Sequence, residues 1–193
     1  ISIEDRDNVN KSGNSFVNWT WVANGGVTST NNNGSISSVV QANTVAGFSI
    51  VEFTTPSGGG TVTYGHGLTQ SPEWMIFKKR DATGSWLVFH KSAYDASNGG
   101  YSMVLSTTAA NAAYNTEFGA TAMYPQAPTS TTFALRNSSA TSPNANYIGY
   151  CWHGVEGFSK FGSYTGNGNT NGTFIYTGFV PRFLIMKRIS SSG

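Results

Sequence analysis

The feature that most constrains the fold is a pattern that the chain uses twice, about 110 residues apart. Both copies begin with Gly-Phe-Ser, at residues 47–49 and 157–159, then pass through a Gly-rich stretch and reach a proline. An apolar run that ends in two cations follows each proline, over residues 74–79 and 183–188. Similar sequences have similar packing requirements, so we expect the two copies to occupy equivalent strands of two similar folded units.

A second correspondence lengthens the repeat. The stretch "FVNWTW" at residues 16–21 has the pattern of "YIGYCW" at residues 147–152, so that Trp21 matches Trp152. This predicts that the chain is an excerpt of a longer repeated sequence, in three parts. Residues 1–46 are the end of a preceding repeat plus a polar connection, residues 47–156 are a complete β-sandwich repeat, and residues 157–193 are the start of a further repeat.

Nearly every element is predicted to be a β-strand. Segments rich in aromatic or β-branched residues and bounded by Gly, Asn, Ser or Pro cover residues 47–53, 61–66, 73–79, 86–90, 101–105, 131–135, 147–152, 158–164, 173–178 and 182–187. The run at residues 74–77 is apolar at each position, which indicates a strand covered on both faces. Only residues 108–118 favour a helical turn or two. The fold class predicted is all-β, an antiparallel β-sandwich of the concanavalin or jelly-roll type with an internal repeat of about 110 residues.

The amino-acid composition restricts the classes of partner that the chain can bind. The chain has 38% hydrophobic residues, enough for a core, but only 10% charged ones, so its surface must consist mainly of Ser, Thr, Asn and Gly. The net charge of +2 comes from 11 basic and 9 acidic residues without a run of either sign. Phosphate binding needs concentrated cations, so we expect no nucleic-acid partner. No apolar run approaches the roughly 18–20 residues of a membrane span, so we expect no membrane insertion.

No motif predicts catalysis or a metal centre. The three histidines have no HxH or HExxH spacing, and the nine carboxylates show no pair placed for glycoside hydrolysis. Ser49 and Ser159 lack the second glycine of a nucleophile elbow. Cys151 is the single cysteine, which favours an inert core thiol over an interchain or reactive one. We therefore expect no catalytic residue, no metal and no cofactor.

Aromatic side chains have two interpretations, core packing or ligand contact. Residues shared by the two copies are expected in the core, and these are Phe48, Phe158, Trp21, Trp152, Ile76 and Ile185. Residues in copy-specific loops are free to recognise a ligand, because they do not maintain the shared fold. The candidates for ligand binding are Trp86, Tyr94, Tyr114, Tyr124 and His66. His66 joins them because the flanking Gly65 and Gly67 allow close approach, although these glycines also suit a β-bulge.

Several phrases together resemble one known family. They are "GFSIVEF", "GHGLTQSPEWMIFKKR", "WLVFH", "YIGYCWHGVEGFSKFGSYTGNGNTNGTFIYTGF" and "PRFLIMKR". In this order, over roughly residues 35–188, they resemble the repeated β-rich domain of tail-fibre and other virion structural proteins of tailed phages, many of them marine. The departures are "GLTQSP", where a second glycine is expected, and His153. The resemblance implies a virion component with a sandwich fold, and it supplies no catalytic or binding residues.

Three functions compete at this point. The first is a noncatalytic tail-fibre or receptor-binding module that holds a host-surface glycan or protein by aromatic stacking and hydrogen bonds, strengthened by repetition of weak sites. The second is a capsid decoration or fibre-shaft protein without a ligand, and the third is a polysaccharide depolymerase. The resemblance implies location on the virion surface and contact with other virion proteins. A homo-oligomer is expected because one weak site on a neutral surface rarely suffices to hold a partner.

Overall fold

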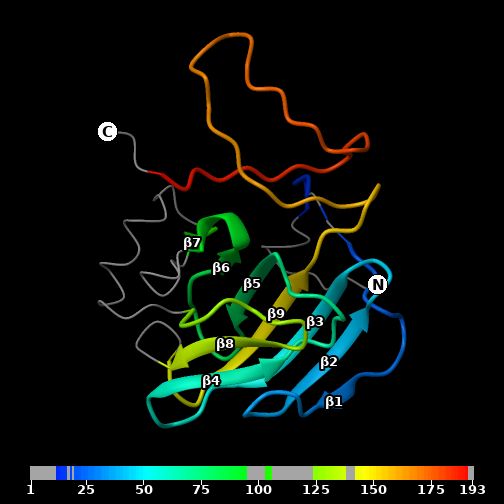
Figure 1. Cartoon of the computed structure of the whole chain (residues 1–193). Helices are drawn as coiled ribbons and strands as arrows, with labels where there is room; N and C mark the ends of the chain where they lie inside the picture. Colours follow the sequence, from blue (N-terminus) through cyan, green and yellow to red (C-terminus); the bar gives the residue numbers. More distant parts are fainter. Residues whose placement is uncertain are drawn as a thin grey trace.

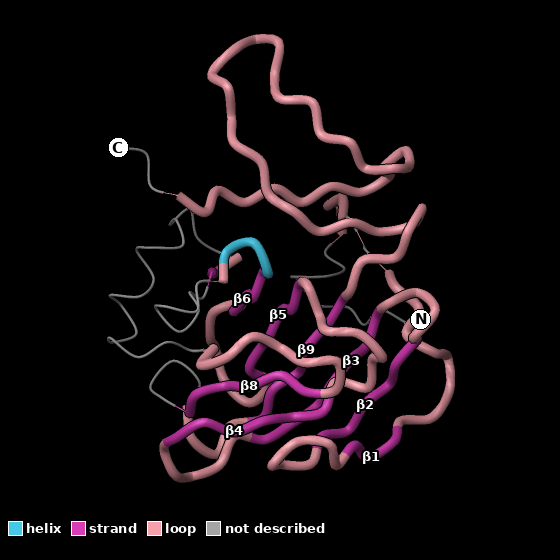
Figure 2. Tube along the Cα trace, viewed as in Figure 1, coloured by secondary structure: helices cyan, strands magenta, loops and turns pink. Residues whose placement is uncertain are grey.

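The computed structural model describes residues 12–16, 18, 20–94, 103–105, 124–137 and 142–190. These residues form strands and one short 3-10 helix (Figures 1 and 2). The elements are β1 (Ser29–Asn31), β2 (Ser38–Asn43), β3 (Phe48–Thr54), β4 (Gly60–Gly65), β5 (Trp74–Lys79), β6 (Leu87–His90), η1 (Lys91–Ala93), β7 (Met103–Val104), β8 (Thr132–Asn137) and β9 (Asn146–Trp152). The predicted all-β class is therefore confirmed.

Seven strands form one antiparallel sheet in the order β1-β2-β3-β9-β5-β6-β7, and β4 pairs with β8 in a second, two-stranded sheet. The last strand, β9, lies between β3 and β5. Its Trp152 is opposite Phe48 on one side and Trp74 on the other. The strands β3 and β5 are thus joined only through β9. The centre of the sheet is complete only when β9, the last strand in the sequence, has inserted between them.

One face of the large sheet packs against β4 and β8, which lie in front of it in Figure 1. Alternate side chains of each strand point to this face, as the pleat requires. Phe53 lies at the centre, with its ring centroid 4.3 Å from that of Tyr64 and 5.6 Å from that of Phe133. Gly149 leaves room for the neighbouring Phe77 ring, because a Cβ at Gly149 would come within 2.8 Å of that ring. This core is fully covered by protein.

On the opposite face of the large sheet lies a cluster of side chains that we call the aromatic face. It is formed by Phe48, Ile50, Trp74, Ile76, Tyr150 and Trp152. Trp152 is its centre, stacked on Phe48 at 5.0 Å and on Trp74 at 4.4 Å between ring centroids. No strand of the described chain covers this face. Ala23 from the N-terminal side, with Phe161 and Ile189 from the C-terminal side, pack on it instead. The prediction that residues 74–77 are covered on both faces is confirmed.

Most predicted strands of the central part are confirmed to within one or two residues. Those at 47–53, 61–66, 73–79, 86–90, 131–135 and 147–152 correspond to β3, β4, β5, β6, β8 and β9. The prediction at 101–105 falls partly outside the described residues, and β7 occupies 103–104. The strands β1 and β2 were missed; β1 lies in a Ser- and Asn-rich stretch with little β propensity, and β2 has only the pair Val39 and Val40 as β-branched residues. The helical leaning at 108–118 lies outside the described residues.

The C-terminal arm, residues 155–190, differs from expectation. The strands predicted at 158–164, 173–178 and 182–187 are wrong, since the arm contains no strand longer than an isolated bridge between Val155 and Ser159. It runs as extended loops beyond the end of the large sheet, orange to red in Figure 1. The two copies of the pattern thus have different conformations, and the internal repeat is not confirmed.

The expected core divides in the same way. Phe48, Ile76 and Trp152 are buried, which confirms that part of the prediction. Their counterparts are exposed, with 63% of Phe158, 43% of Ile185 and 46% of Trp21 accessible to solvent. The physical reason is that the counterparts lie in segments without paired neighbouring strands, so no sheet surface forms on which they can pack.

Candidate functional site

The five predicted ligand-binding residues are not gathered on one surface. Tyr124 is only 1% exposed and Tyr94 is half-buried, and both rings contact Phe89, at 5.3 and 5.9 Å between centroids. These two tyrosines therefore serve the core rather than a loop surface. Tyr114 lies outside the described residues. Of the candidates that are described, Trp86 alone is exposed.

His66 is a satisfied core histidine. It is inaccessible to solvent, its Nε2 lies 3.2 Å from the Thr129 carbonyl oxygen, and its Nδ1 accepts a hydrogen bond from the Leu68 amide at 3.1 Å. Because Nδ1 accepts, Nε2 carries the proton and donates to Thr129, so both ring nitrogens are used by the neutral ring. The pKa of His66 is lowered to about 4, mainly by burial; the hydrogen bond to Thr129 opposes this shift and the charge of His153 adds to it. No surface role remains for this ring.

Trp86 directly precedes β6 and is 39% exposed. The Lys78 ammonium lies 5.7 Å from the centre of its ring and donates to the Gly84 carbonyl oxygen at 2.5 Å. The Trp86 carbonyl accepts from the Leu105 amide, which fixes the backbone beside the ring. A half-exposed indole with a cation over one face can stack on a flat or apolar ligand with its free surface.

The root of the arm is fixed to the large sheet. The Glu73 carboxylate, just before β5, accepts from Lys91 Nζ at 2.6 Å and from the Gly154 amide at 3.2 Å. A tight turn follows, in which the Val155 and Ser159 backbones bond each other in both directions at 3.1 and 2.9 Å. The arm therefore leaves β9 in a defined direction.

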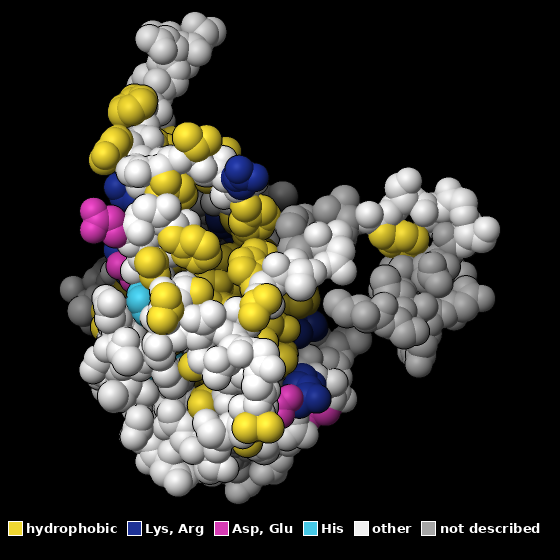
Figure 3. All heavy atoms as spheres, turned by 90° about the vertical axis from the view of Figure 1, so that its right-hand side faces the viewer, with side chains coloured by type: hydrophobic (Ala, Val, Ile, Leu, Met, Phe, Trp, Pro, Cys, Tyr) yellow, Lys and Arg dark blue, Asp and Glu magenta, His cyan; other side chains and the backbone are white. Residues whose placement is uncertain are grey.

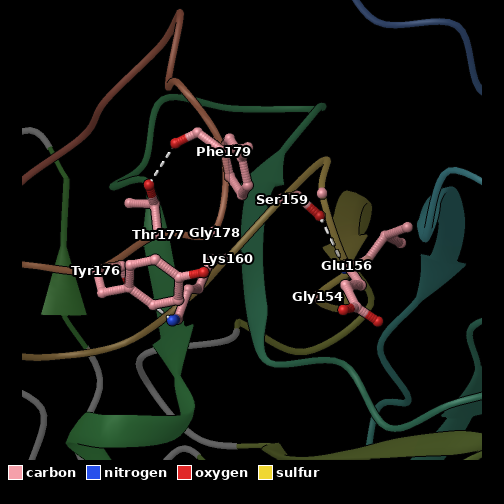
Figure 4. A pocket seen from close by; sticks show the side chains of 10 residues that line it. Gly154, Glu156, Ser159, Lys160, Tyr176, Thr177, Gly178 and Phe179 are labelled. Atoms are coloured by element: carbon pink, nitrogen blue, oxygen red, sulfur yellow. Dashed lines mark hydrogen bonds between the residues drawn. The ribbon is translucent and has the colours of Figure 1, made fainter.

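A cavity of about 470 Å³ lies at this root, between the turn at residues 154–160 and the returning segment at residues 176–179 (Figure 4). Its lining has one carboxylate, Glu156, and one ammonium, Lys160, with hydroxyl groups and two aromatic rings. Lys160 Nζ donates to the Tyr176 carbonyl oxygen at 2.7 Å and lies 5.4 Å from the Tyr176 ring centre. These contacts join the two halves of the arm across the cavity.

The polar groups around this cavity are mainly engaged with one another. The Ser159 hydroxyl accepts from the Val155 amide at 3.1 Å, and the Thr177 hydroxyl donates to the Phe179 carbonyl at 2.5 Å. A site built to hold a charged ligand presents unpaired donors or acceptors, and here the ammonium is already committed to the backbone. We therefore interpret the cavity as a space between two joined segments of the arm rather than as a ligand pocket.

The exposed apolar surface of the arm is its most unusual property. Phe174, Tyr176, Val180, Leu184 and Met186 are each between 65% and 89% exposed. Figure 3 shows hydrophobic side chains gathered across the middle of the side that it presents, between the arm and the sheet. Our sequence reasoning missed this surface because it assigned the arm to strands.

Other chemistry is sparse in the described part of the chain. There, no group of three His, Cys, Asp or Glu side chains is arranged to hold a metal ion. Cys151 is fully buried, and burial raises the pKa of its thiol above the usual range. Among the described residues, no helix is long and apolar enough to cross a membrane.

The fold and the arm together define an all-β protein with a large antiparallel sheet and an exposed apolar extension. Residues 1–193 match the model of a family described as a domain of unknown function (DUF7483), and the chain belongs to that family. No curated protein matches the chain. No solved structure matches it either.

Proposed function

We propose that this chain is a noncatalytic structural module of a tailed-phage virion, of the tail-fibre type, that works in several copies joined through the C-terminal arm. The observation that carries the proposal is the exposed apolar surface of the arm. Phe174 is 86% exposed and Val180 is 89% exposed. Contiguous apolar surface of this kind is uncommon on monomeric proteins and typically marks a site of association.

Hydrogen bonds between segments far apart in the arm support this function. Tyr164 OH lies 3.4 Å from the Met186 sulfur, and the Thr173 hydroxyl donates to the Thr165 carbonyl at 2.8 Å. These bonds join separate segments of the arm and restrict its conformation. A restricted segment loses less conformational entropy on association than an unrestrained one does.

The proposal includes the finer prediction of the fold. Each unit is a concanavalin- or jelly-roll-like sandwich, residues 47–156 form one unit, and residues 157–193 begin another. A local similarity supports it, because Gly47 and Gly157 begin the two copies with left-handed φ angles of 64° and 74°. The same residue in the same conformation is what equivalent positions require.

The virion setting rests on the resemblance of the phrases at residues 35–188 to phage structural proteins. It fits a neutral polar surface, since only 10% of the residues are charged. An electron cryomicroscopy map of the phage particle tests it directly. Density for the unit along a fibre or on the capsid is expected, and absence of the chain from purified particles would contradict the proposal.

A second candidate function is recognition of a host-surface glycan or protein, and Trp86 is the observation that favours it. The ring is 39% exposed and has Lys78 beside it. The test is a glycan array and host-cell binding with wild type and Trp86→Ala, with reducing ends measured in parallel. Binding lost in the variant would support recognition, and steady sugar release would contradict the noncatalytic assignment.

A further inference from the structure

One loop of the C-terminal arm contains two Asn-Gly pairs, Asn167–Gly168 and Asn171–Gly172. An asparagine that precedes glycine deamidates readily, because glycine has no Cβ to hinder the attack of its main-chain nitrogen on the asparagine side chain. Both pairs are exposed to solvent. The sequence alone does not separate them, whereas the hydrogen bonds of the loop do.

The carboxamide of Asn167 is held at both ends. Its Nδ2 donates to the Asn171 carbonyl oxygen at 2.9 Å, and its Oδ1 accepts from the Asn169 amide at 3.1 Å. The second bond is the turn that asparagine side chains form with the main chain two residues further on. Deamidation requires the Asn167 Cγ to turn toward the Gly168 nitrogen and the Nδ2 to leave as ammonia. The first movement competes with the Oδ1 bond, and the second breaks the Nδ2 bond.

The side chain of Asn171 is held by neither kind of contact. Its main-chain amide donates to the Asn169 Oδ1 at 3.1 Å, and its carbonyl oxygen accepts from Asn167, so its backbone is fixed. Within the described residues, the Asn171 carboxamide and the Gly172 amide form no hydrogen bond. A Cβ added at Gly172 would have nothing within 4 Å, so the surroundings of this glycine are open.

We infer that Asn171 is a site of spontaneous deamidation and that Asn167 is protected from the same reaction while the loop is folded. The Gly172 nitrogen bonds to the Asn171 Cγ, the Cγ–Nδ2 bond breaks, and the proton of the attacking nitrogen passes through solvent to the departing ammonia. Water then opens the cyclic succinimide. Cleavage between Cγ and the nitrogen gives aspartate, and cleavage between the main-chain carbonyl carbon and the nitrogen gives isoaspartate.

The reaction changes the charge of the arm. The charged side chains of residues 155–190 are one carboxylate and four cations, namely Glu156, Lys160, Arg182, Lys187 and Arg188. A carboxylate at residue 171 raises the acidic residues of the chain from 9 to 10 against 11 basic ones, so the net charge falls from +2 to +1. Isoaspartate also lengthens the main chain by one carbon at this position. The inference does not depend on the proposed assembly function.

The test compares the two asparagines in one protein. The full chain is kept at mildly alkaline pH in heavy-oxygen water, folded in one sample and unfolded in guanidinium chloride in another. Incubation ends when half of Asn171 in the unfolded sample has reacted. Digestion and mass spectrometry then give the fraction of aspartate and isoaspartate at each site. The oxygen label shows that the water was added during the incubation rather than during the digestion.

In the folded chain, Asn171 is expected to react roughly tenfold faster than Asn167, relative to the ratio of the two rates in the unfolded chain. One hydrogen bond corresponds to about a factor of two to five, and Asn167 has two of them to break. An unchanged ratio on folding, or no conversion of Asn171 in the folded chain, would overturn the inference.

Gly172→Ala is the matched variant. The added carbon meets open space, so circular dichroism is expected to show a retained fold. Because the Cβ hinders the attacking nitrogen, conversion at Asn171 is expected to slow severalfold, while conversion at Asn167 stays as in wild type. A variant that reacts at Asn171 as fast as wild type would show that the Gly172 nitrogen is not the nucleophile, and would refute the inference.

Discussion

The buried His66 makes the stability of this protein depend on pH in a defined window. The ring is inaccessible to solvent, and burial lowers its pKa from 6.5 to about 4. The unfolded chain takes up a proton as the pH falls through 6.5, but the folded chain does not until about pH 4. Stability that is present above pH 6.5 is therefore lost progressively as the pH falls toward about 4.

The size of the effect follows from the shift. One pKa unit corresponds to about 1.4 kcal/mol, so the whole window contributes roughly 3 kcal/mol, of which about 2 kcal/mol falls between about pH 7 and pH 5. The perturbation is His66→Gln, which retains a side-chain donor for the Thr129 carbonyl and removes the titration. Burial also lowers the pKa of His90, but that group is present in both proteins and cancels in their difference.

The assay is urea unfolding of wild type and His66→Gln, followed by tryptophan fluorescence at about pH 7, 6 and 5. Wild type is expected to lose about 2 kcal/mol more than the variant over this range. Equal pH dependence in the two proteins would show that His66 is not a buried neutral ring, and would refute the reasoning.

Two further substitutions test the packing. Trp152→Ala removes the centre of the aromatic face and is expected to cost about 3–5 kcal/mol by urea unfolding, whereas the half-exposed Trp86→Ala should cost less than about 1 kcal/mol. Similar losses in both would contradict the assigned burial. Gly149→Ala forces a Cβ to within 2.8 Å of the Phe77 ring and should cost about 1–3 kcal/mol. Gly58→Ala, with nothing within 4 Å of the added carbon, is its control in a thermal melt. A Gly149→Ala protein that melts with the control would show that the ring yields freely.

The central strands were predictable because they carry their own signals. The run at residues 74–77 is apolar at each position, and the structure buries it on both faces, as a central strand requires. The strands β1 and β2 have no such apolar run and are defined by pairing instead, β2 with β3 and β1 with β2. Whether a segment pairs depends on the strand beside it, and the β propensity of the segment's own residues does not show this.

The C-terminal arm shows the opposite case, in which strand signals in the sequence do not lead to a strand. Residues 182–187 have the same strand signals as β5, yet they form no strand, because a strand needs a neighbour as well as a sequence. Two of the candidate site residues are buried for a related reason. Tyr124 and His66 stand beside turn residues in the sequence, but long-range packing against Phe89 and Thr129 places both inside. Exposure of an aromatic residue in a loop is decided by which distant elements cover it.

The most direct test of the assembly account is the mass of the chain in solution. Light scattering is measured over a range of concentrations for wild type and for a variant with Phe174, Val180, Leu184 and Met186 changed to Ser. A control variant changes Val27 and Val45, 92% and 86% exposed outside the arm, to Ser. The account predicts a mass of two or more chains for wild type and the control, and of one chain for the arm variant. A wild-type protein of one chain's mass at every concentration, or an arm variant that associates as wild type does, would contradict it.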